Sequence, residues 1–385
     1  MTPLGFDPHS DRIQLAHKRL SDAYHRVPGA ETPVVEPGAR RPAVSYTEKD
    51  VLADFDKMLE ASLAWAGGLA STDNDWSPMI NTYCGVVMVA EAFGCPVVFD
   101  PFGTAWTHPA ITDISQVWNL KPVPPQESPM IRRLSEWIDF AQRKIGTETQ
   151  YWTEDIQSPF SVAARVVESE ELLAACISDP DAVHHLCRMI TDYSILMMRE
   201  HIAEMEHPAF PGRNFPSISE NVGICIADDT PLIMLSPAMY REFALPYNAM
   251  IGEAFGGIHI HSCGDYRHNL GVLLETPNLK SIQLHAGVGE FPLPETATED
   301  CAFNRARTQV ACLVDSSDIS RGDEYRGRGA DHHREYILPR LCQTDITGLI
   351  LQTPGVGPGI PDSEAALKWT RRELAEAQLP LQRPV

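Results

Sequence analysis

The sequence has 385 residues, of which 43% are hydrophobic and 22% charged, so it can bury a large core within one domain. Its formal net charge of −21 argues against nucleic acid or an anionic membrane surface as a partner. The nine cysteines form no C-x-x-C pair, and no secretory signal or membrane-spanning apolar run is present, which favours a reduced compartment. We therefore expect a soluble cytoplasmic enzyme.

Helical and strand patterns alternate along the chain. Residues 10–26 predict an amphipathic helix with Ser10 as its N-cap, and a short strand is expected at 32–35. Further helices are predicted at 47–68, 86–93, 130–143, 161–206 with a break at 178–180, 236–246, 270–274, 333–342 and from 362. Further strands are predicted at 96–99, 149–153, 221–227, 258–260, 281–285, 309–315 and 348–352. This alternation is typical of an α/β barrel, which we place at residues 46–385 after an N-terminal helical extension at 1–45.

Chemistry in α/β barrels takes place at the carboxyl ends of the strands. Several polar residues fall at the predicted strand ends, namely Asp155, Asp228, Asp229, His261, Cys263, His285, Asp315 and Gln352. We assign Asp155, Asp228 and Asp229 as candidate catalytic acids, and Gln352, Asp315 and Asp75 as candidate substrate contacts. Asp75 belongs to a polar segment, 71–76, for which an ordinary capping turn is the alternative. Because adjacent side chains project to opposite faces, one of Asp228 and Asp229 is expected to point into the barrel mouth.

The segment 255–265 is a short apolar strand that ends in His261 and Cys263. Side chains alternate along a strand, so these two share one side. Imidazole nitrogen and thiolate sulfur are ligands that zinc takes readily, and one strand end can deliver both to one ion. The alternative is a buried histidine and a buried thiol packed in a core.

The run from His261 to Asp265 follows Asp228 and Asp229 and the phrase 235–247, and together these resemble the uroporphyrinogen decarboxylase superfamily. The likeness extends from about residue 45 to the C-terminus and is closest to the zinc-dependent, corrinoid-linked methyltransferase branch. It implies a (β/α)₈ TIM barrel, zinc held by the His-x-Cys-Gly motif, and a methyl group carried by a corrinoid protein. The expected partners are a small methyl donor or acceptor, that corrinoid protein, and a second copy in a homodimer.

The resemblance also implies a later cysteine at the end of the final strand as a third zinc ligand. The corresponding segment, 351–355, contains none. His285 ends the strand after the His-x-Cys strand, and adjacent strands lie about 4.8 Å apart, so His285 is the expected substitute. Cys312, three residues before the end of its strand, is the weaker alternative.

Two other functions stay open. One is a metal-independent decarboxylase-like lyase that uses Asp155 or an aspartate of the 228–229 pair as its acid. The other is a non-catalytic barrel that binds a ligand, because fold does not determine function. The charged, glycine-rich segment 321–331 is expected to be a mobile loop over the site, with a solvated loop away from the site as the alternative.

Overall fold

The computed structural model describes residues 4–36, 46–82, 84–154, 156–285, 306, 309–315, 329–342, 346–354, 356 and 360–378. Asp155 and most of the expected loop, 321–328, lie outside these residues. The strands that contain His285 and Asp315 are described, but the side chains of these two residues are not.

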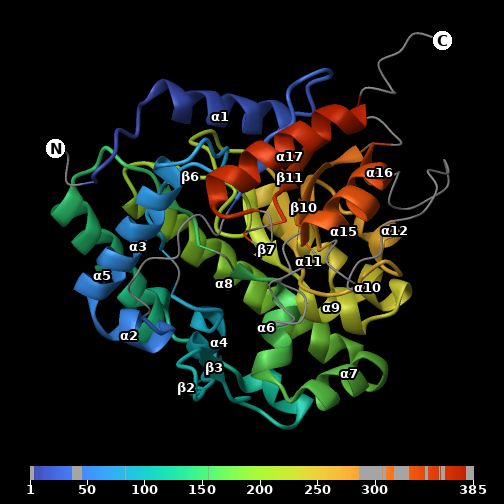
Figure 1. Ribbon diagram of the computed structural model, residues 1–385. Helices are drawn as coiled ribbons and strands as arrows, with labels where there is room; N and C mark the ends of the chain where they lie inside the picture. Colours follow the sequence, from blue (N-terminus) through green and yellow to red (C-terminus); the bar gives the residue numbers. More distant parts are fainter. Residues whose placement is uncertain are drawn as a thin grey trace.

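A seven-stranded parallel sheet forms most of the barrel (Figure 1). Its order is β1-β11-β10-β9-β8-β7-β5. The strands are β1 (Val34–Val35), β5 (Ile156–Gln157), β7 (Ile224–Ala227), β8 (Ile258–His261), β9 (Leu279–His285), β10 (Ala311–Asp315) and β11 (Leu349–Gln352). All of their pairings run parallel, as expected when a helical crossover joins successive strands.

The segment around Ile80 joins β1, one edge of this sheet, to the strand that begins at Tyr151. Ile80 bridges in parallel to Tyr151, and the Asp75 amide donates to the Val34 carbonyl of β1 at 3.2 Å. Tyr151 begins β4 (Tyr151–Trp152), which also pairs with the short β6 (Pro208–Ala209). The prediction of a (β/α)₈ barrel is confirmed.

Two details of the predicted strands need correction. β1 pairs with β11, so the first barrel strand lies before residue 46, where the sequence placed the start of the barrel. The strand predicted at 96–99 is β2 (Val97–Phe99), which pairs antiparallel with β3 (Ala105–Thr107) in a separate hairpin. It therefore contributes nothing to the barrel wall.

The helices follow the predicted order. They are α1 (Asp11–Tyr24), α2 (Glu48–Ala53), α3 (Phe55–Ala70), α4 (Met88–Ala92), α5 (Pro129–Ile145), α6 (Pro159–Val166), α7 (Ser169–Ser178), α8 (Pro180–Glu204), α9 (Asp229–Met234), α10 (Pro237–Phe243), α11 (Leu245–Phe255), α12 (Leu270–Leu273), α15 (Gly329–His332), α16 (Leu338–Leu341) and α17 (Ser363–Gln378). Shorter turns occur at η1 (Ile114–Asn119), η2 (Pro125–Glu127) and η3 (His333–Ile337).

The long helices predicted at 47–68 and 161–206 are divided by local hydrogen bonds. Asp54 breaks the first, because its carboxylate accepts the amides of Asp56 and Lys57 and starts α3. The second has a break beyond the predicted one, at Val167, whose extended backbone pairs with Ile111. In the part of the chain that the structure describes, no helix has both the length and the apolar character needed to cross a bilayer.

Candidate metal site

In the described part of the chain, a cluster of potential metal ligands lies where β7 and β8 end side by side. The two strands are in register with Ala227 opposite His261, so Asp228 and Asp229 follow β7 at the level where His261 ends β8. The Asp228 amide donates to the His261 carbonyl at 2.9 Å, which continues the pairing one residue further. The local sheet register therefore brings residues separated by more than 30 positions together.

Asp229, His261 and Cys263 form a set of potential metal ligands. One ligand atom from each lies within 4.8 Å of the other two. His261 Nε2 and Cys263 Sγ are 3.2 Å apart, and Cys263 is exposed. Zinc binds nitrogen at about 2.0 Å and sulfur at about 2.3 Å, so two of its tetrahedral ligands lie about 3.5 Å apart. The donor types and their spacing fit a zinc ion.

The loop that carries Cys263 is fastened to the start of α9. The Cys263 amide donates to Asp229 Oδ1 at 2.6 Å, and this bond joins two of the three potential ligands directly. Gly264 follows, and a Cβ atom there would lie 2.4 Å from the Ile233 Cδ1 atom on α9. The glycine of the motif lets the loop lie close against α9.

Asp228 occupies a different environment from its neighbour. It is completely buried, and its Oδ2 accepts hydrogen bonds from Tyr240 at 2.6 Å and from Asn248 at 2.9 Å. Burial raises the pKa of Asp228 to about 7, although hydrogen bonds from Ser158, Tyr240 and Asn248 act in the opposite direction. Asp229 therefore belongs to the ligand cluster, whereas Asp228 is an acid enclosed behind it.

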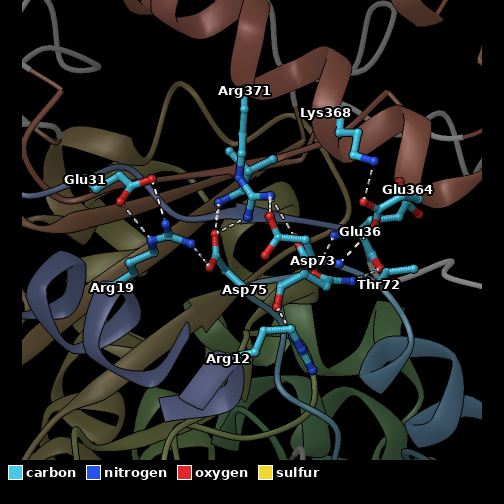
Figure 2. A network of polar contacts seen from close by, with 12 residues as sticks. Arg12, Arg19, Glu31, Glu36, Thr72, Asp73, Asp75, Glu364, Lys368 and Arg371 are labelled. Atoms are coloured by element: carbon cyan, nitrogen blue, oxygen red, sulfur yellow. Dashed lines mark hydrogen bonds and ion pairs between the residues drawn. The ribbon is translucent and has the colours of Figure 1, made fainter. Parts of the chain in front are cut away.

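Asp75 does not join this cluster, which argues against the predicted substrate contact. Its carboxylate is bound by Arg19 of α1 and Arg371 of α17, each at 3.0 Å, and by the Val34 amide at 2.8 Å (Figure 2). All three partners belong to helices or strands of the barrel scaffold, and Asp75 is 1% exposed. This geometry favours a structural role, in which Asp75 ties the two terminal helices to the first strand.

The remaining predicted site residues lie at strand ends. Gln352 ends β11 opposite Val35, with its side chain 2% exposed. His285 and Asp315 are backbone partners at the ends of β9 and β10. Asp155 is outside the described residues. Cys312, the weaker ligand candidate, is buried with its Sγ 3.8 Å from the Val310 carbonyl, away from the set formed by Asp229, His261 and Cys263.

Sequence reasoning missed the residues that support this site. Gln283 Oε1 lies 2.6 Å from His261 Nδ1, and Tyr240 and Asn248 hold Asp228. A signal for Gln283 was present, because strand alternation puts it on the same face as His285. No spacing rule points to Tyr240 and Asn248, which lie 12 and 20 residues from Asp228 on two other helices.

Fold and cluster together define an α/β-barrel protein with potential metal-ligand side chains at the carboxyl ends of its strands. Within that class, part of the chain is similar to the uroporphyrinogen decarboxylase family: the family model described as Uroporphyrinogen decarboxylase (URO-D) matches residues 56–205. This confirms the resemblance inferred from the sequence. The matched segment ends before β7, so His261 and Cys263 lie outside it.

A solved structure supports the same fold. The methyltransferase from Methanosarcina mazei superposes with a TM-score of 0.60 and 15% identity, over 96% of this chain and 99% of that chain. At this identity the likeness shows the fold and nothing finer. A comparison with curated proteins found no significant match.

Proposed function

We propose that this protein is a methyltransferase whose site is built around one zinc ion held by His261, Cys263 and Asp229. The observation that carries the proposal is the convergence of these three donor atoms within 4.8 Å. The structural neighbour from Methanosarcina mazei is a methyltransferase, which supports the reaction class. A bound zinc ion supplies Lewis acidity, which lowers the pKa of a thiol acceptor or polarises a methyl donor.

The surrounding residues have separate tasks in this proposal. Cys263 is exposed, so the open side of the site faces the solvent from which a small substrate arrives. Asp229 Oδ1 orients Cys263 by accepting a hydrogen bond of 2.6 Å from its backbone amide. The second carboxylate oxygen of Asp229 is still available to bind the ion. A metal site with three protein ligands keeps a fourth position for a substrate, which is the usual arrangement in catalytic zinc sites.

His285 remains the alternative third ligand predicted from the sequence. Its backbone lies at the end of β9, the strand next to β8. A corrinoid protein as methyl carrier and a homodimeric assembly also remain proposals. The corrinoid protein follows from the resemblance to corrinoid-linked methyltransferases and is tested by measuring its binding to the purified chain. The homodimer is tested by measuring the oligomeric state of the purified chain.

Metal content and methyl transfer in matched cysteine variants test the proposal. Wild-type protein is expected to bind one equivalent of zinc, and Cys263→Ser is expected to lose the zinc and the methyl transfer together. Cys312→Ser is the matched control, because this thiol is buried beside the Val310 carbonyl and is expected to keep both. Wild-type protein that takes up no zinc on titration would contradict the proposal and favour the metal-independent lyase.

A further inference from the structure

β8 carries two histidines, and each faces a polar side chain on β9. His259 Nδ1 lies 2.5 Å from Ser281 Oγ, and His261 Nδ1 lies 2.6 Å from Gln283 Oε1. Both pairs join β8 to β9, and the register pair Ile260–Ile282 lies between them. They differ in what the second ring nitrogen of each histidine meets.

His259 is enclosed by the protein. Its Nε2 lies 2.9 Å from the Val222 carbonyl, so both ring nitrogens have partners, and the side chain is completely buried. The rings of Tyr24 and Phe215 pack edge-on against it, and burial lowers its pKa to about 3. The ring is neutral and serves the packing of the barrel interior.

His261 presents its second nitrogen to the ligand cluster instead. Its Nε2 is 3.2 Å from Cys263 Sγ, while Nδ1 meets the amide oxygen of Gln283. An amide oxygen accepts hydrogen bonds and cannot donate them, so Nδ1 of the neutral ring carries the proton. The lone pair is then on Nε2, on the side of Cys263, which is the protonation state that a metal ligand requires.

Gln283 is itself held in place. It is 5% exposed, and its main-chain carbonyl accepts a hydrogen bond of 2.6 Å from the Tyr266 hydroxyl. Tyr266 is completely buried and belongs to the loop that follows Cys263, so the strand and the loop are joined. A buried side chain on a backbone fixed in this way can impose one ring orientation on His261 at little further entropic cost.

We propose that Gln283 is a positioning residue that holds His261 in the Nδ1–H tautomer and turns the Nε2 lone pair toward Cys263. The part of this inference that concerns zinc affinity rests on the proposed function. The tautomer itself does not, because it is a property of the chain without an ion.

Three variants test the inference through zinc affinity, measured by competition with a chromogenic chelator. Gln283→Met removes the acceptor and is expected to weaken zinc binding about 10- to 100-fold, as second-shell changes commonly do. Gln283→Glu keeps the acceptor and is expected to restore affinity to within about threefold of wild type. Ser281→Ala removes the hydroxyl that contacts His259 and is the matched control, since it leaves the groups around His261 intact and is expected to leave zinc affinity unchanged.

The tautomer is read independently from two-bond ¹⁵N–¹H correlations of ¹⁵N-histidine-labelled protein without metal. The His261 signals are assigned as those missing in His261→Asn. Wild type and Gln283→Glu are expected to show the Nδ1–H form, and Gln283→Met a mixture of both forms. The Nε2–H form in wild type, or unchanged zinc affinity in folded Gln283→Met, would overturn the inference.

The two readouts also separate this inference from the proposed function. If wild type takes up no zinc, the proposed function fails, and the tautomer in wild type and Gln283→Met alone decides the role of Gln283. If Gln283→Met does not fold, Gln283→Glu carries the test, because loss of the Nδ1–H form in that variant contradicts the inference.

Discussion

The amide of Cys263 donates to Asp229 Oδ1 at 2.6 Å, and this bond ties the loop after β8 to the first residue of α9. Two of the three potential ligands are thereby fixed to each other before any ion binds. Ligands prearranged in this way give up less conformational entropy on binding. Asp229 is therefore both a potential ligand and the residue that holds the Cys263 loop in position.

Asp229→Asn is expected to lower zinc affinity at least about tenfold, because it removes a charged ligand from the set. The asparagine Oδ1 still accepts the Cys263 amide, so the loop is expected to stay in place. Isothermal titration with zinc measures the change, and circular dichroism checks the fold.

Two further variants decide what that result means. Asp265→Asn is the matched control, because this nearby carboxylate is paired with Arg267 at 2.5 Å and is expected to leave the affinity unchanged. His285→Ala tests the ligand predicted from the sequence. Zinc loss in His285→Ala, with full affinity in Asp229→Asn, would assign the third position to His285.

The sequence predicted the strands of the site better than the contacts of individual side chains. Strand alternation predicted His261 and Cys263 on one side; β8 ends at His261 and Cys263 lies in the loop that follows, yet their ligand atoms are 3.2 Å apart. Alternation did not decide between Asp228 and Asp229. That choice depends on Tyr240 and Asn248, which come from α10 and α11 and enclose Asp228.

Asp75 illustrates the same limit. Its polar neighbours made it resemble a residue of the barrel mouth, but its partners Arg19 and Arg371 lie 56 and 296 positions away. Local patterns report periodicity and capping, whereas pairing across the fold depends on how helices at the two ends of the chain pack. No local signal identifies those arginines as the partners of this carboxylate.

Asp75→Asn is expected to destabilise the protein by about 3 kcal/mol, because it leaves two partly buried arginines without their common carboxylate. Urea unfolding at neutral pH measures the loss. The control is Asp192→Asn, whose ion pair with Arg188 is exposed on α8 and contributes less than about 0.5 kcal/mol. Equal stability of the two variants would contradict the structural role of Asp75.

Gly223→Ala is expected to lower the free energy of unfolding by about 2 kcal/mol or more, because the backbone conformation disfavours a side chain and no room exists for a Cβ atom. Gly223 has a φ of +109°, and an added Cβ atom would lie 2.4 Å from the Gly257 carbonyl oxygen at the start of β8. That neighbour is backbone and cannot turn away. The thermal unfolding midpoint is expected to fall accordingly.

Gly67→Ala is expected to raise the thermal unfolding midpoint in the same assay. Gly67 lies inside α3, and an added Cβ atom would meet nothing within 4 Å. Alanine is favoured over glycine in a helix by about 1 kcal/mol, so this variant is expected to be more stable than wild type. A Gly223→Ala protein as stable as Gly67→Ala would mean that β7 and β8 do not approach as closely as the structure has them.

His201 on α8 is expected to make the protein less stable in acid. The side chain is 1% exposed, and burial lowers its pKa from 6.5 to about 4. The unfolded chain therefore takes up a proton below about pH 6.5 that the folded chain refuses until about pH 4, and stability falls with pH across that window. Between about pH 7 and about pH 5 the expected loss from this residue is about 2 kcal/mol.

His201→Met removes the titrating group and isolates this contribution. Urea unfolding of wild type and variant at both pH values gives a double difference in which groups common to both proteins cancel. The variant is expected to lose about 2 kcal/mol less than wild type on acidification, whatever its stability at neutral pH. Parallel losses in the two proteins would show that His201 takes up its proton equally well in the folded and unfolded chains.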